Sequence, residues 1–327
     1  MVDEQQLRDA VRKTIARKDV KYVVGYDKGT TGFQAAPTFA YEEKDAEKFV
    51  FNPTCVNNLS VYPMLEDKPP LRRGEEPDTR KIGIVLKGCD SRAIVQIIQE
   101  KGLKRDDVVV IGIPCTGVVD PKKLKEKFPG PIKSIEVKDD NDTFTVTVDG
   151  KTQKISKDEL ISDKCKECEY PTPIIHDILI GKEIKSSKKP NYKEIESIEK
   201  QPLDAKWKRW EKEFDRCIRC YACRSACPLC YCKECMVDLL DPQWVRRSVN
   251  LSENTAWNLL RAFHLAGRCM GCGECERACP MNIPLIKLNK KITKDIQEMY
   301  EYKAGIDAEA KPLLAMFKPD DPEEFIL

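Results

Sequence analysis

Histidine is scarce in this sequence, with 2 residues in 327, and no apolar run approaches the ~18 residues of a membrane-spanning helix. The first residues contain no basic segment followed by an apolar stretch, so we expect no secretory signal. Neither sign of charge dominates, because 56 Lys and Arg residues face 54 Asp and Glu residues. This balance gives no reason to expect nucleic acid or an anionic membrane as a partner. We therefore expect a cytoplasmic protein without a membrane span.

A Rossmann dinucleotide fingerprint is also missing, since no G-x-G-x-x-G segment occurs. The scarcity of histidine argues against most zinc enzymes. What the sequence has instead is 16 cysteines, many of them two or three residues apart. Neighbours at that spacing are poor disulfide partners and good chelators, and the chain is long for a disulfide framework. Metal binding through thiolates is therefore the expectation.

The most specific motif is C-x2-C-x2-C-x3-C-P, which occurs twice. The first copy contains Cys217, Cys220, Cys223 and Cys227, and the second contains Cys269, Cys272, Cys275 and Cys279. In two-cluster ferredoxins the fourth cysteine of each motif binds the other cluster. We therefore expect two [4Fe-4S] clusters with crossed ligands. The first ferredoxin set is Cys217, Cys220, Cys223 and Cys279, and the second ferredoxin set is Cys269, Cys272, Cys275 and Cys227. Zinc or disulfides are the alternative.

The cysteine pattern also divides the chain into segments. We expect an α/β domain over residues 1–185, a charged linker over 186–212, a dicluster ferredoxin domain over 213–290, and a C-terminal helix and tail over 291–327. The insertion between the two motifs is longer than in a compact bacterial ferredoxin. The domain therefore looks like the mainly α-helical dicluster ferredoxin of respiratory and heterodisulfide-reductase-type complexes. The Lys-rich and Glu-rich linker could instead dock a partner subunit.

The first domain reads as α/β with a parallel sheet. Residues 82–86 and 108–113 are apolar strands, separated by a helix for which Asp90 offers an N-cap. Cys89 and Cys115 each follow the carboxyl end of one of these strands. Neighbouring parallel strands end side by side, so the two thiols should lie close together at the edge where such sheets bind ligands. Two buried structural cysteines are the alternative.

Two further groups of cysteines complete the metal hypothesis. Cys165 and Cys168 form a C-x2-C pair, which alone suits zinc or a redox dithiol. With Cys89 and Cys115 they supply four thiolates, the cavity set, for which we expect a third [4Fe-4S] cluster. The remaining cysteines are Cys55, Cys230, Cys232 and Cys235. They are candidate ligands of a fourth cluster, with zinc or a ligand from another source as alternatives.

Four segments of the first domain carry a resemblance to a known family. They are 49–53 (Phe-Val-Phe-Asn-Pro), 109–115 (Val-Val-Ile-Gly-Ile-Pro-Cys), 165–170 (Cys-Lys-Glu-Cys-Glu-Tyr) and 177–181 (Asp-Ile-Leu-Ile-Gly). The region from about Val20 to Gly181 resembles the β-subunit family of coenzyme F-420 (F420) reducing hydrogenase and F420-dependent formate dehydrogenase. The resemblance implies an FAD that exchanges a hydride with F420 and passes single electrons to [4Fe-4S] clusters. It also implies an anaerobic complex with formate dehydrogenase, hydrogenase or heterodisulfide-reductase-type subunits.

The resemblance also suggests flavin contacts. They are Asn52, Pro53, Asn57, Asn58, Lys87 and Arg92. The turn formed by Gly29, Thr30, Thr31 and Gly32 is a candidate phosphate cradle, with an ordinary loop as the alternative. No catalytic side chain is identified. The expected function is an iron–sulfur flavoprotein subunit that transfers electrons, since a flavin converts two-electron into one-electron steps. A flavin-free wiring subunit is the alternative, and a zinc-ribbon-type protein is a third.

Overall fold

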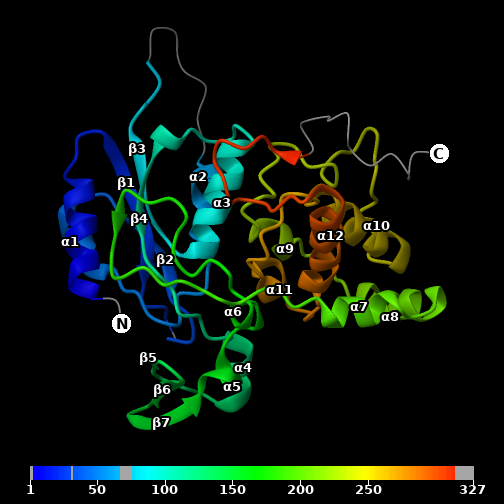
Figure 1. The fold of residues 1–327 in the computed structure, drawn as a ribbon, viewed down its shortest axis with the longest axis horizontal. Helices are drawn as coiled ribbons and strands as arrows, with labels where there is room; N and C mark the ends of the chain where they lie inside the picture. Colours follow the sequence, from blue (N-terminus) through cyan, green and yellow to red (C-terminus); the bar gives the residue numbers. More distant parts are fainter. Residues whose placement is uncertain (1–2, 31, 67–75, 314–327) are drawn as a thin grey trace. The chain divides into compact units, whose positions relative to one another are not determined.

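The computed structural model describes residues 3–30, 32–66 and 76–313. The chain divides into two compact units, Met1–Pro190 and Asn191–Leu327 (Figure 1). The division falls inside the segment 186–212, and the part of that segment after Pro190 contains a short helix and most of a longer one. Thr31, in the candidate phosphate turn, and the tail after residue 313 lie outside the described residues.

The first unit is built on a five-stranded sheet in the order β2-β1-β3-β4-β8. The strands are β1 (Val20–Asp27), β2 (Ala36–Ala40), β3 (Lys81–Leu86), β4 (Val108–Gly112) and β8 (Ile178–Leu179). Strands β1, β3, β4 and β8 run parallel, and β2 pairs with β1 in the antiparallel direction. Helices α1 (Glu4–Ile15) and α3 (Gly88–Gln99) lie on opposite sides of this sheet (Figure 1). The expected α/β unit with a mostly parallel sheet is therefore confirmed.

The start of α3 differs from the sequence expectation. Asp90 was expected to cap the helix, but the helix begins two residues earlier, with Lys87 as its N-cap. Asp90 occupies the third helical position, and its Oδ2 accepts a hydrogen bond from the backbone N–H of Lys87 at 3.4 Å. A carboxylate at this position satisfies a free N–H from inside the helix. As a result, Cys89 lies in the first turn of α3 rather than in the loop before it.

A small antiparallel sheet forms a second core in the first unit. It contains β5 (Ile135–Asp140), β6 (Thr143–Val148) and β7 (Lys151–Ser156) in that order. Phe144 and Val146 of β6 are fully buried against Leu124 of α4 (Pro121–Lys127) and Leu160 of α5 (Lys157–Leu160). The short helix α6 (Asp163–Lys166) follows directly and carries Cys165. The remaining short elements of this unit are α2 (Tyr62–Leu65) and the 3-10 helices Glu43–Lys48, Leu59–Val61 and Arg105–Asp107.

The second unit consists of helices joined by irregular segments. They are α7 (Lys193–Glu199), α8 (Leu203–Asp215), α9 (Ala222–Ser225), α10 (Leu251–His264), α11 (Glu274–Ala278) and α12 (Leu285–Tyr300). Within residues 191–313, no strand is present. Across both units, no helix in the described ranges combines the length and apolar composition needed to cross a bilayer.

Candidate iron–sulfur centres

The four thiols of the cavity set line one cavity in the first unit. The cavity has a volume of about 270 Å³, and its wall includes Cys89, Cys115, Cys165 and Cys168. Cys89 comes from the first turn of α3, and Cys115 follows β4. The other two come from α6 and the loop after it. The pattern of strand ends and the C-x2-C pair therefore predicted which four cysteines share this cavity.

Backbone contacts hold the cavity wall together. The N–H of Cys115 donates to the carbonyl oxygen of Pro171 at 2.9 Å, and the N–H of Cys165 donates to Ser162 at 2.9 Å. The loop around Tyr170 passes so close to α3 that a Cβ on Gly88 would lie 1.8 Å from the Tyr170 carbonyl oxygen. Only glycine permits this approach, so Gly88 fixes the distance between α3 and the loop that carries Cys168.

The segment 184–188, which we call the strap, also lines the cavity. Ser186 Oγ donates to the carbonyl oxygen of Cys168 at 2.7 Å, and Lys188 Nζ donates to that of Cys165 at 3.0 Å. Thr172 Oγ1 bonds both the N–H and the carbonyl oxygen of Ile184, at 2.8 and 2.9 Å. Sequence reasoning missed the strap, because its polar contacts are long-range and leave no local pattern. Its lysines were visible, but as part of a basic segment that was expected to be linker.

Burial makes the thiolate form unfavourable in this cavity when no metal compensates it. Burial raises the pKa of Cys115 to about 12 and raises the pKa of Cys89 well above its ordinary value. Burial also raises the pKa of Cys168, with a further contribution from the charge of Cys165. Iron would supply the positive charge that buried thiolates need, so the donor set and its setting fit a metal cluster. Four thiols and no other soft ligands match an all-cysteine [4Fe-4S] site.

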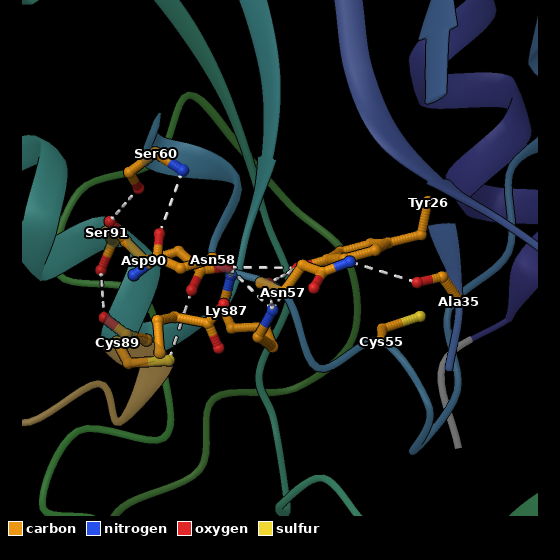
Figure 2. Close-up of polar contacts among 12 residues, drawn as sticks. Tyr26, Ala35, Cys55, Asn57, Asn58, Ser60, Lys87, Cys89, Asp90 and Ser91 are labelled. Atoms are coloured by element: carbon orange, nitrogen blue, oxygen red, sulfur yellow. Dashed lines mark hydrogen bonds and ion pairs between the residues drawn. The ribbon is translucent and has the colours of Figure 1, made fainter. Parts of the chain in front are cut away.

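Lys87 forms a buried network beside this cavity (Figure 2). Its Nζ lies 2.9 Å from Oδ2 of Asp90, donates to the carbonyl oxygen of Asn57 at 2.8 Å, and donates to the hydroxyl oxygen of Tyr26. Burial alone would lower the pKa of Lys87, but the negative charges of Asp90 and Cys89 outweigh it and the pKa is raised. Lys87 is thus a fixed positive charge on the cavity wall.

The side chains expected to contact flavin are mostly engaged within the chain. All three protons of the Lys87 ammonium are used by the acceptors just described. Oδ1 of Asn52 accepts from the backbone N–H of Thr54 at 2.9 Å, and the carbonyl oxygen of Pro53 accepts from Val119 at 2.9 Å. The described contacts therefore do not form a prepared flavin site at these residues.

The remaining candidates are arranged in a similar way. Nδ2 of Asn57 donates to Ala35 at 3.3 Å, whereas Nδ2 of Asn58 is buried without a hydrogen-bond partner. The guanidinium of Arg92 lies over the ring of Tyr170, 4.9 Å from its centroid. In the candidate phosphate turn, the N–H of Gly32 donates to the carbonyl oxygen of Gly29 at 3.2 Å. These contacts give each of these candidates a structural role and do not identify a bound group.

The two ferredoxin motifs of the second unit share one backbone conformation. Arg219 and Tyr221 in the first motif have positive φ angles of 55° and 58°. Gly271 and Gly273 stand at the same places in the second motif, with φ of 74° and 70°. The left-handed conformation costs a non-glycine residue about 1–2 kcal/mol, so its retention at Arg219 and Tyr221 indicates that the loop geometry is required. Tyr221 and Gly273 are the N-caps of α9 and α11.

The thiols of these motifs are grouped in the crossed arrangement. Burial raises the pKa of Cys223, and the thiols whose charges raise it further are those of Cys217, Cys279 and Cys220. Burial also raises the pKa of Cys275, where the contributing thiols are those of Cys227, Cys269 and Cys272. Each motif thus has the fourth cysteine of the other motif among its neighbours. Hydrogen bonds reach the sulfurs from the Ile283 N–H to Cys279 at 3.5 Å and from Asn289 Nδ2 to Cys275 at 3.7 Å.

The four remaining cysteines are separated between the units. Cys55 is fully buried in the first unit, where its sulfur accepts from the Asn52 N–H at 3.4 Å. Cys230, Cys232 and Cys235 belong to the second unit, and Cys232 is exposed. Cys230 is hydrogen bonded to Cys227, which lowers the pKa of Cys230. Within the described ranges, no three Cys, His, Asp or Glu side chains are close enough together to hold a single metal ion.

Comparisons with known proteins match both parts of the chain. Residues 79–201 match the family model for the carboxyl-terminal region of the coenzyme F420 hydrogenase/dehydrogenase beta subunit, and residues 216–284 match a 4Fe-4S dicluster domain. The first match contains the cavity set but not Cys55 or the candidate flavin contacts at 52–58. The second contains both ferredoxin sets. These matches confirm the resemblance stated from the sequence.

Individual relatives agree with the family matches. The F420-dependent formate dehydrogenase subunit beta of Methanocaldococcus jannaschii is 26% identical over 291 residues, covering 72% of this chain and 76% of the relative. The F420-dependent formate dehydrogenase 1 subunit beta of Methanococcus maripaludis is 26% identical over 355 residues, covering 89% of this chain and 88% of the relative. A solved chain of the F420-reducing [NiFe] hydrogenase complex from Methanosarcina barkeri matches 52% of this chain and 64% of its own length, at 13% identity and a TM-score of 0.33.

Proposed function

We propose that this protein is the electron-transfer subunit of an F420-dependent oxidoreductase, because residues 79–201 belong to the coenzyme F420 hydrogenase/dehydrogenase beta-subunit family and residues 216–284 form a 4Fe-4S dicluster domain. Its partner in the proposal is a catalytic subunit of the formate dehydrogenase or hydrogenase type. The carrying observation is that three sets of four thiols are grouped, one around a cavity and two in the crossed arrangement. No other side chains on the described surface form an obvious alternative site for two-electron chemistry.

The proposal assigns three [4Fe-4S] clusters to the chain. The cavity set holds one, and the first and second ferredoxin sets hold the others. A cluster of this type supplies one-electron transfer when it is bound. The chain supplies the thiolates, excludes water by burying most of them, and places cations and N–H donors beside them. Lys87 performs this second role in the cavity, and Asn289 performs it at Cys275.

A flavin that exchanges a hydride with F420 is the finer part of the proposal. It would supply the conversion between two-electron and one-electron steps. The relatives' names support F420, but the side chains assigned to flavin are already bonded within the chain, Lys87 completely so. A flavin contact at Lys87 would therefore have to displace Tyr26, Asn57 or Asp90. These internal bonds favour the second candidate function, a flavin-free wiring subunit with the same clusters.

Metal and flavin analysis of anaerobically purified full-length protein tests both versions. The three proposed clusters require about twelve iron atoms per chain, whereas the ferredoxin sets alone require about eight. About one acid-released flavin per chain, together with bleaching of the cluster absorbance by reduced F420, supports the flavoprotein. Full iron without flavin supports the wiring subunit. A colourless protein that contains zinc would contradict the proposal in either form.

A further inference from the structure

Arg261 occupies an unusual place on helix α10. The buried stripe of this helix contains Asn254, Trp257, Asn258, Arg261 and Ala262, which share one helical face. Arg261 is 4% exposed, although long charged side chains are rarely buried without a partner. An isolated charge in such a position costs several kcal/mol. Its presence on the stripe therefore indicates a nearby source of negative charge.

The surroundings of Arg261 identify that source. Its Nη2 donates to the carbonyl oxygen of Cys223 at 3.0 Å, whereas the buried Nε has no hydrogen-bond partner. Burial opposes the charge on Arg261, but the charges of Cys275, Cys227, Cys230 and Cys223 outweigh burial and raise its pKa. Cys223 belongs to the first ferredoxin set, and Cys275 and Cys227 belong to the second. One guanidinium is thus close to thiols of both sets.

We propose that Arg261 is a shared electrostatic anchor that raises the reduction potentials of both ferredoxin clusters. The inference rests on the proposed function, since it requires that both sets hold clusters. Four thiolates give a loaded site a negative charge, and an added electron increases it. A buried cation near both sets stabilises the reduced state of each, because charge and hydrogen bonds near the sulfurs set cluster potentials. The Nε–H is the donor left for a cluster sulfur.

Two substitutions separate the charge of Arg261 from its packing. Arg261→Gln removes the charge, and Arg261→Lys keeps it on a side chain without the Nε–H. The protein is the anaerobic full-length chain, and the measurement is a redox titration followed by electron paramagnetic resonance. Arg247→Gln, at an exposed position of the same unit, is the matched control. The cluster of the cavity set is recognised as the signal missing from a Cys168→Ser variant and serves as an internal reference.

The expected result for Arg261→Gln is full iron content and a shift of both ferredoxin potentials to lower values. The cavity-set potential should stay unchanged, and Arg261→Lys should restore most of the shift. Unchanged ferredoxin potentials in fully loaded Arg261→Gln would overturn the proposal. If Arg261→Gln loses iron, recovery of iron in Arg261→Lys supports the charge role, whereas loss in both variants shows a packing role and overturns it. Failure of the proposed function is distinct, because wild-type protein would then hold less than about eight iron atoms.

Discussion

Nζ of Lys87 and Oδ2 of Asp90 lie 2.9 Å apart, and their side chains are 2% and 0% exposed. The pair joins the N-cap of α3 to its third residue, on either side of Cys89. A buried ion pair loses the hydration of both charges, so it is weak evidence for stability as a whole. Its partners are nevertheless strongly dependent on each other, and the first turn of α3 depends on both.

Asp90→Asn should therefore destabilise the first unit. The change leaves the Lys87 ammonium buried without a counter-charge, which costs roughly 3–5 kcal/mol. Urea unfolding of the full-length protein, followed by circular dichroism, measures the loss. The matched control is Glu159→Gln, which removes the exposed 2.8 Å ion pair with Lys127 and should cost less than about 1 kcal/mol. Equal losses in the two variants would show that the buried pair has no special role.

Gly88→Ala should remove the cluster of the cavity set while leaving the others. The added methyl group would lie 1.8 Å from the backbone oxygen of Tyr170, so the loop that carries Cys168 must move. The expected iron content falls from about twelve to about eight atoms per chain. Gly130→Ala is the control, because Gly130 also has a conformation that favours glycine but has no atom within 4 Å of an added Cβ. Full iron in Gly88→Ala would mean that the loop position does not determine binding.

Some of this arrangement follows from local sequence, and some does not. Cys89 and Cys115 could be placed at one sheet edge because β3 and β4 are short apolar strands joined by an evident helix. The start of α3 was misplaced by two residues because an Asp serves equally well as an N-cap or at the third position. The strap at 184–188 and the contact from Lys87 to Tyr26 were not foreseen. Both join polar groups distant in sequence, and no periodicity records such contacts.

The crossed grouping of the ferredoxin thiols predicts which cysteine variants behave alike. Cys279→Ser should alter the same electron paramagnetic resonance signal as Cys220→Ser, although Cys279 belongs to the second motif. Cys227→Ser should in turn alter the same signal as Cys272→Ser. The reason is that Cys279 is a neighbour of Cys223, and Cys227 is a neighbour of Cys275. If Cys279→Ser and Cys272→Ser affected one signal and Cys220→Ser another, each motif would instead bind its own cluster.

Cys55→Ala should leave the iron content unchanged at about twelve atoms per chain. The Cys55 sulfur is fully buried between the backbone of Asn52 and Val50, and burial raises its pKa to about 12. A thiol in this setting is a packing group, so removing its sulfur should cost only roughly 1–2 kcal/mol through the small cavity it leaves. Cys115→Ala is the matched control and should lower the iron content by about four atoms. A comparable loss from Cys55→Ala would instead make Cys55 a ligand, and the fourth-cluster hypothesis would then describe this residue correctly.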